Sequence, residues 1–175
     1  MSEDRDDDKF VEVWRSRRRI RPKIEKNWVD SEWAKGRSQY LTFLIRIRDE
    51  KIAKRIVEIQ NKLSAVPCVD PFPKEYLHIT VKGCGFLAES KIYEDDILIE
   101  NSQKIISQAK EVLRAFDKFN AFLSKLTLSS DVVFIEVHDG GKSGELNKGL
   151  QTILEIKNMR FDHPNFLPHI SQSTT

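Results

Sequence analysis

Two short segments of this 175-residue chain place a histidine and a hydroxyl side chain two positions apart. In the first, His78, Thr80 and Lys82 alternate with apolar residues, and in the second His169 is followed by Ser171 in the same arrangement. Such alternation predicts β-strands, in which side chains two apart share one face. Each strand can therefore bury its apolar face while the other face presents an imidazole and a hydroxyl, which suits a phosphate group.

These side chains have the chemistry that is needed to open a cyclic phosphodiester. One imidazole can deprotonate water and a second can protonate the departing oxygen, because imidazole exchanges protons near neutral pH. The hydroxyls of Thr80 and Ser171 can donate hydrogen bonds to phosphate oxygens, and Lys82 can add positive charge. We therefore predict catalytic roles for His78 and His169 and phosphate binding by the other three residues, without a metal or cofactor.

The intervening sequence predicts the elements that position these strands. An apolar run at 41–47 predicts a buried strand, and Asp49 is placed to cap a helix over about 50–65. The glycines at 83 and 85 predict that the first histidine strand ends there in a turn or bulge. The later patterns predict a helix over about 102–116, strands over about 121–128 and 132–137, and a last strand with His169. Between the last two strands they predict a helix over about 144–157, which is capped by Ser143 and carries Leu154 in its apolar stripe.

The predicted elements repeat along the chain. His169 lies 91 positions after His78, and the same offset brings the strand at 41–47 onto the strand at 132–137. The helices that follow these strands also fall near each other under this shift. A duplicated strand–helix–strand unit, related by a pseudo-two-fold axis, would bring both histidine strands together across one cleft.

Composition limits the class of protein. Apolar residues make up 39% and charged residues 32% of the chain, which is typical of a globular domain with a charged surface. The net charge of +2 gives no global signal for nucleic acid. Two cysteines, Cys68 and Cys84, are too few for a disulfide framework, and no apolar run or signal peptide indicates a membrane or secreted protein. We expect a monomeric cytoplasmic protein without membrane contact.

The first 39 residues differ from the remainder. A basic run follows an acidic start and comprises Arg15, Arg17, Arg18, Arg19, Arg21 and Lys23. Phe10, Val13 and Trp14 share one face of a short predicted helix. The segment is either a basic arm that holds RNA phosphates and stacks on bases, or a charged helix that docks on the main body; we prefer the second, because most charge runs are only surface. We predict an N-terminal extension over 1–39, partly disordered or docked, and one domain over 40–175.

The segments His78-Ile79-Thr80-Val81-Lys82-Gly83 and Pro168-His169-Ile170-Ser171 resemble the signature of the two-histidine phosphoesterases. The most similar group is the 2′-5′ RNA ligase-like, RNA 2′,3′-cyclic phosphodiesterase type, and the resemblance extends from about Tyr40 to the C-terminus. It implies an α+β fold of two lobes with antiparallel-rich sheets, a pseudo-two-fold axis and both histidines in a central cleft. It also implies metal-independent opening of a 2′,3′-cyclic phosphate at an RNA end to a 2′-phosphate, with reversible 2′-5′ ligation in some members.

The last strand departs from this family pattern in two ways. Gln172 stands where the second motif usually has an apolar residue. The sequence also stops at Thr175, where the family commonly continues with further strand. We therefore expect either a trimmed C-terminal lobe or a piece of a longer chain.

Three other functions fit parts of the sequence. The first is a non-catalytic module that binds RNA ends or a nucleotide, and the second is a phosphodiesterase for a small cyclic nucleotide or an ADP-ribose cyclic phosphate. The third is a zinc site, for which the candidate ligands are His78, Cys84, His138, His163 and His169. These residues lack the close pairs that are typical of zinc sites. We therefore expect no metal, a structural role for Cys84, and no chemistry at His138 and His163.

Overall fold

The computed structural model describes residues 10–12, 15, 32–66, 69–128, 132–156 and 166–174. Along the chain the elements, with η for a 3-10 helix, are β1 (Tyr40–Arg46), α2 (Glu50–Leu63), β2 (Asp70–Pro71), η2 (Lys74–Tyr76), β3 (His78–Ala88), β4 (Asp96–Leu98), η3 (Ile99–Asn101), α3 (Ser102–Arg114), β5 (Phe122–Leu128), β6 (Val132–His138), α4 (Lys142–Leu150) and β7 (His169–Thr174). Helices and mostly antiparallel strands combine in one chain, which confirms the α+β class.

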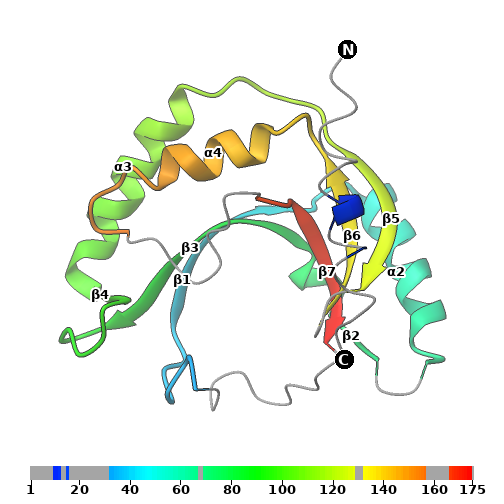
Figure 1. Cartoon of the computed structure of the whole chain (residues 1–175), viewed down its shortest axis with the longest axis horizontal. Coiled ribbons are helices and arrows are strands. Elements are labelled where there is room, and N and C mark those ends of the chain that lie inside the picture. The colour runs from blue at the N-terminus through cyan, green and yellow to red at the C-terminus, as the bar shows by residue number, and fades with distance from the viewer. Residues whose placement is uncertain are drawn as a thin grey trace.

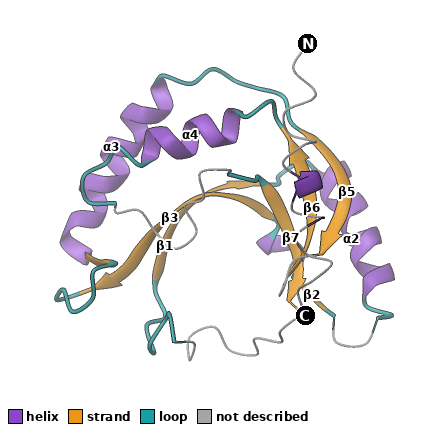
Figure 2. Ribbon diagram, viewed as in Figure 1, coloured by secondary structure: helices purple, strands orange, loops and turns teal. Residues whose placement is uncertain are grey.

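The seven strands of the described ranges join one sheet. Its main path runs β1-β3-β7-β6-β5, while β2 pairs with β7 and β4 pairs with β3. Every pairing is antiparallel except that of β3 with β4. The strands curve into an arch, with α3 and α4 outside one arm and α2 outside the other (Figures 1 and 2). We call the inner surface of this arch the concave face.

One apolar core lies between α2 and the strands that carry the histidines. Ala53 and Ile56 of α2 share this core with Ile79 of β3 and Ile170 of β7. The helix begins where the sequence predicts, because the Asp49 carboxylate accepts hydrogen bonds from the amides of residues 51 and 52. A capped, amphipathic helix thus covers the convex side of the sheet centre.

A second apolar core lies between α3, α4 and the strands β1 and β3. It contains Ile105 of α3, Leu146 and Leu150 of α4, and Val81 of β3. Ile45 of β1 packs against both cores and so joins them. The two cores on one curved sheet are the two lobes that the resemblance implies.

β3 is longer than predicted. The sequence predicts that it ends at residues 83–85, but it continues to Ala88. Its register against β1 shifts between Leu41 and Thr42 and again between Phe43 and Leu44, so bulges interrupt the pairing without ending the strand. Gly85 has a φ of 148°, and a Cβ there would clash with the carbonyl oxygen of Asp95. This glycine therefore permits a close approach of two backbones inside the strand.

α4 differs from the predicted helix at both ends. It begins before Ser143, because the Asp139 carboxylate accepts hydrogen bonds from the amides of Gly141 and Ser143, both at 2.9 Å. Asp139, and not Ser143, therefore supplies the side chain that organises the start of the helix. The helix ends at Leu150, and Leu154 is 89% exposed. The predicted extension to about residue 157, with Leu154 in its apolar stripe, is wrong.

Part of the N-terminal extension contacts the main body. Phe10 is 2% exposed, and its ring lies 5.0 Å from that of His138. Trp33 packs against Tyr40 and Phe86, whereas Val13 and Trp14 fall outside the residues that the structure describes. The division of the chain at residue 39 stays a prediction. No helix in the described ranges has the length and apolar character to cross a membrane.

Candidate active site

The two histidine strands are neighbours in the sheet. β3 pairs with β7 through Ile79 and Ile170, which occupy equivalent places in the two histidine segments. Equivalent residues pair in this way when a pseudo-two-fold axis runs between their strands. Because both isoleucines are buried with α2 on the convex side, the alternate residues of each strand lie on the concave face.

The register of these strands groups the predicted catalytic and hydroxyl residues. If antiparallel pairing is continued by one residue on either side of the Ile79–Ile170 pair, His78 falls across from Ser171 and Thr80 across from His169. The two histidines are then diagonal neighbours, a relation that separates residues by roughly 7–8 Å. One phosphate group with a hydrogen bond on each side can span such a distance.

Both imidazoles are oriented by the same local contact. Nδ1 of His78 lies 2.5 Å from the carbonyl oxygen of Tyr76, and Nδ1 of His169 lies 2.9 Å from that of Leu167. A carbonyl oxygen only accepts hydrogen bonds, so each Nδ1 donates and Nε2 is the basic nitrogen of the neutral ring. In both strands the carbonyl oxygen two residues before the histidine therefore fixes the same tautomer of the neutral ring, with the hydrogen on Nδ1 and the lone pair on Nε2.

The candidate phosphate-binding residues differ in their exposure. Both histidines and Ser171 are half-buried, and Thr80 is exposed, so each of the four has surface that a ligand can reach. Lys82, in contrast, is 1% exposed. Contact between Lys82 and a phosphate stays a prediction, and it requires that the side chain become uncovered.

On one side of the histidines, β1 adds a cation that the sequence analysis missed. Arg46 pairs with His78, and Leu44 pairs with Thr80, in the register of β1 and β3. Residues directly across an antiparallel pair share a face, so both side chains lie on the concave face. Both are exposed, Leu44 at 39%. A charge within an apolar strand was the available signal, but the sequence does not reveal which residue lies across from it.

On the other side, β6 adds an acidic and an aromatic side chain. Glu136 pairs with His169 in the strand register, and the Phe134 ring lies 4.9 Å from that of His169. Glu136 is 2% exposed, accepts a hydrogen bond from the Thr127 hydroxyl and lies 3.3 Å from Nε2 of His138. Packed side chains therefore close the concave face on this side.

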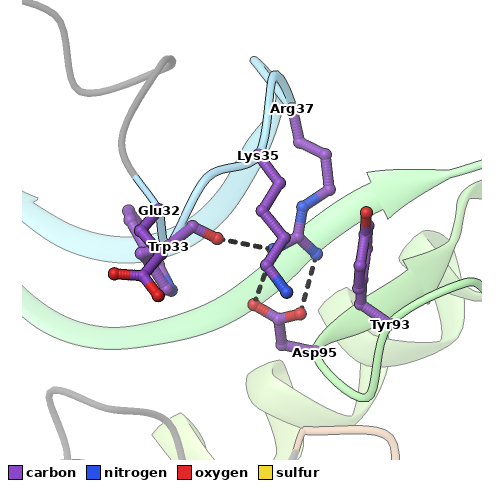
Figure 3. A pocket seen from close by; sticks show the side chains of 6 residues that line it. All are labelled: Glu32, Trp33, Lys35, Arg37, Tyr93 and Asp95. Atoms are coloured by element: carbon purple, nitrogen blue, oxygen red, sulfur yellow. Dashed lines mark hydrogen bonds and ion pairs between the residues drawn. The ribbon is translucent and has the colours of Figure 1, made fainter.

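A cavity of about 350 Å³ lies away from the histidines, where residues 32–37 meet the segment before β4. Its lining residues are Glu32, Trp33, Lys35, Arg37, Tyr93 and Asp95 (Figure 3). The Arg37 guanidinium binds the carboxylates of Asp95 and Asp96 and two backbone carbonyl oxygens. We call Arg37, Asp95 and Asp96 the Arg37 clasp.

The Arg37 clasp is a structural feature. Burial alone would lower the pKa of Arg37, but hydrogen bonds to Asp95 and Asp96 raise it above its ordinary value. All five N–H donors of the guanidinium are used within the protein, so this arginine has none left for a ligand. The clasp fastens residues 32–37 to the sheet edge.

The remaining candidates add little to the site. Arg15 is exposed, while Arg17, Arg18, Arg19, Arg21, Lys23 and His163 lie outside the described residues. Cys84 is buried, and its thiol contacts the carbonyl oxygen of Lys82 at 3.7 Å, as in a packed structural cysteine. Across the described ranges, no three or more His, Cys, Asp or Glu side chains group in a way that could hold a metal ion.

Comparison with known families agrees with this arrangement. The family model of the 2′-5′ RNA ligase superfamily matches residues 49–173, which include both histidines and the hydroxyl residues that follow them. The chain belongs to this superfamily, and the resemblance seen in its sequence is confirmed. No curated protein matches the chain.

Solved structures are similar to the chain in fold. TT0787 of Thermus thermophilus aligns with a TM-score of 0.56 and 18% identity over 78% of this chain and 74% of its own. ATU0111 of Agrobacterium tumefaciens, a conserved protein of unknown function, aligns with a TM-score of 0.50 and 15% identity over 77% and 62%. Escherichia coli LigT in its apo form aligns with a TM-score of 0.49 and 15% identity over 78% of this chain and 73% of its own. At these identities the first two matches concern the fold alone.

Proposed function

We propose that this chain is a metal-independent phosphodiesterase that opens 2′,3′-cyclic phosphate ends of RNA to 2′-phosphates. The observation that carries the proposal is the matched pair of His78 and His169 on adjacent strands, each bonded through Nδ1 to a carbonyl oxygen and each followed two residues later by a hydroxyl residue. Two equivalent imidazoles at one phosphate supply both proton transfers of ring opening. Membership of the 2′-5′ RNA ligase superfamily supports RNA as the substrate class.

In the proposed reaction, water attacks phosphorus while one neutral imidazole takes a proton from that water through Nε2. The bond from phosphorus to the 3′ oxygen breaks, and the second imidazole, which starts protonated, gives its proton to that oxygen. Thr80 and Ser171 donate hydrogen bonds to the non-bridging oxygens, where negative charge grows. The products are a 2′-phosphate and a 3′-hydroxyl. With a 5′-hydroxyl in place of water, the same steps form a 2′-5′ linkage.

An oligoribonucleotide that ends in a 2′,3′-cyclic phosphate tests this proposal. With the full chain and EDTA present, we expect conversion to the 2′-phosphate, identified by chromatography against 2′- and 3′-phosphate standards. The rate plotted against pH is expected to be bell-shaped, because one imidazole must start neutral and the other protonated. Loss of turnover in EDTA, or a 3′-phosphate product, would contradict the proposal.

A further inference from the structure

The concave face is closed on one side of the histidine pair and open on the other. Toward β6, Glu136 and Phe134 are buried, at 2% and 4% exposure. Toward β1, Leu44 and Arg46 are both exposed. A substrate that is larger than its reacting phosphate therefore has room to extend over β1.

Arg46 makes the open side suitable for a second phosphate. It lies across from His78 on the neighbouring strand, and neighbouring strands are about 4.8 Å apart. Its long side chain therefore starts one strand outward from the reacting phosphate. A guanidinium binds phosphate through paired N–H donors. Within the described ranges no carboxylate forms an ion pair with Arg46, in contrast to Arg37 of the clasp.

The opposite side lacks this capacity. The residue in register with His169 is Glu136, a buried carboxylate that would repel a phosphate. The two sides of the histidine pair thus carry opposite charges at corresponding positions. A chain of phosphates that starts at the histidines has one favourable direction, which is over Arg46.

We propose that Arg46 binds the phosphate that joins the last two nucleosides of the substrate, so that the site prefers an RNA end to a lone cyclic nucleotide. This inference rests on the proposed function, because it takes the reacting phosphate to lie between His78 and His169. It adds a specificity residue outside the two histidine segments. Arg46 touches a phosphate that does not react, so it acts on substrate choice and not on the proton transfers.

Two substrates of different length test the role of Arg46. The probes are uridine 2′,3′-cyclic phosphate and the dinucleotide UpU with a 2′,3′-cyclic phosphate end. We expect Arg46→Ala to lower the ratio of kcat/KM, dinucleotide over mononucleotide, about tenfold, mainly through KM, because one charge-assisted phosphate contact is lost. Arg46→Lys is expected to restore part of the ratio, since lysine supplies a point charge without the paired donors. In a plot of log KM for the dinucleotide against the logarithm of the salt concentration, the slope should fall by about 0.7 in Arg46→Ala, because one phosphate contact is lost.

Arg55→Ala is the matched control. It also removes one arginine, but this residue lies on α2, is paired with Glu58 at 2.9 Å and is mostly exposed. We expect its ratio of kcat/KM to equal that of the wild type. A ratio in Arg46→Ala within twofold of the wild type overturns the proposal, whether or not both rates fall.

Binding of the reaction products separates this inference from the proposed reaction. Calorimetry with uridine 2′-phosphate and with UpU bearing a 2′-phosphate needs no turnover. We expect the wild type to bind the dinucleotide more tightly, and Arg46→Ala to lose most of that difference. If the binding difference is found but the wild type shows no turnover, the Arg46 site is supported and the proposed reaction is contradicted. If an active wild type binds both products equally, the Arg46 site is contradicted and the proposed reaction is supported.

Discussion

The two halves of the site share their chemistry and differ in their surroundings. Each half has a histidine whose Nδ1 bonds the carbonyl oxygen two residues earlier, and a hydroxyl two residues later. Beside His78 lies the exposed Arg46, whereas beside His169 lies the buried Glu136. The features that repeat are those that paired proton transfer needs. The features that differ make one side of the concave face open and basic and the other closed and acidic.

The repeated histidines predict similar losses in both halves. His78→Ala and His169→Ala each remove one proton transfer, and we expect each to lower kcat by about 10²–10⁴-fold. The double variant is expected to lose little more than either single variant, because the two groups act as a unit. Single-turnover rates on an oligoribonucleotide with a cyclic phosphate end measure all three.

His138→Gln is the matched control for the histidine variants. This histidine lies on β6, two residues from Glu136, and has no proposed role in the reaction. We expect it to keep most of the wild-type rate. A loss as large as that of His78→Ala would assign acid–base work to His138 and end the pairing of His78 with His169.

The residues that differ predict unequal effects on stability. Glu136→Ala removes the carboxylate that bonds Thr127 and lies near His138 within a packed region, so we expect the free energy of unfolding to fall by about 2–3 kcal/mol. Arg46→Ala removes an exposed side chain, for which we expect a change below about 0.5 kcal/mol. Urea denaturation followed by circular dichroism measures both. Equal losses would contradict the inference that one side of the concave face is closed and the other open.

Features that depend on neighbours along the chain were predictable from the sequence. Asp49 caps α2 as predicted, because the cap bonds the amides two and three residues later. The alternation around His78 and His169 likewise indicated which residues share a face of each strand. The order of α2, α3, α4 and of the strands β1, β3, β5, β6 and β7 followed from these local patterns, whereas the short strands β2 and β4 were not predicted.

Features that depend on contacts between distant segments were not predictable. β3 continues beyond Gly83 and Gly85 because it pairs with β1 and because the Asp95 carbonyl oxygen lies close to Gly85. Both contacts come from other parts of the chain. Arg46 and Glu136 belong to the site only because of strand register, which sequence patterns do not fix. The end of α4 at Leu150 was missed because Leu154 continues the apolar spacing although it faces solvent.

The hydroxyl residues predict smaller and unequal losses of activity. Thr80→Ala and Ser171→Ala each remove one hydrogen bond to a non-bridging oxygen, which we expect to lower kcat by about 10–100-fold. The loss is expected to be smaller for Thr80, because it is more exposed and water can replace its hydroxyl. Thr80→Ser and Ser171→Thr keep a hydroxyl and serve as controls. A larger loss at Thr80 would show that exposure does not set this order.

The smallest expected effect is a change in local stability at acidic pH. It compares the region of the Arg37 clasp, beside β4, with the region where Gln60 contacts the β2 segment. At one edge the Arg37 clasp is ionic, and Asp96 is its most buried carboxylate. Burial alone would raise the pKa of Asp96, but hydrogen bonds from the Tyr93 amide and from Arg37 lower it below its ordinary value. A carboxyl with a lowered pKa stabilises the fold above its unfolded pKa, and that contribution is lost as the pH falls through the folded value.

The contacts of Gln60 beside β2 involve only neutral groups, so this region serves as an internal reference for the pH dependence of the clasp. The Gln60 amide donates to the carbonyl oxygens of Phe72 and Gln172, and neither partner titrates. Below about pH 4, where carboxyl groups protonate, we expect the exchange protection of the Phe86 amide beside the clasp to fall relative to that of the Phe72 amide. Asp96→Asn is expected to abolish this pH dependence of the ratio. If the two amides lose protection in parallel in the wild type, the clasp contributes no separate acid-sensitive stability, and the two edges are equivalent after all.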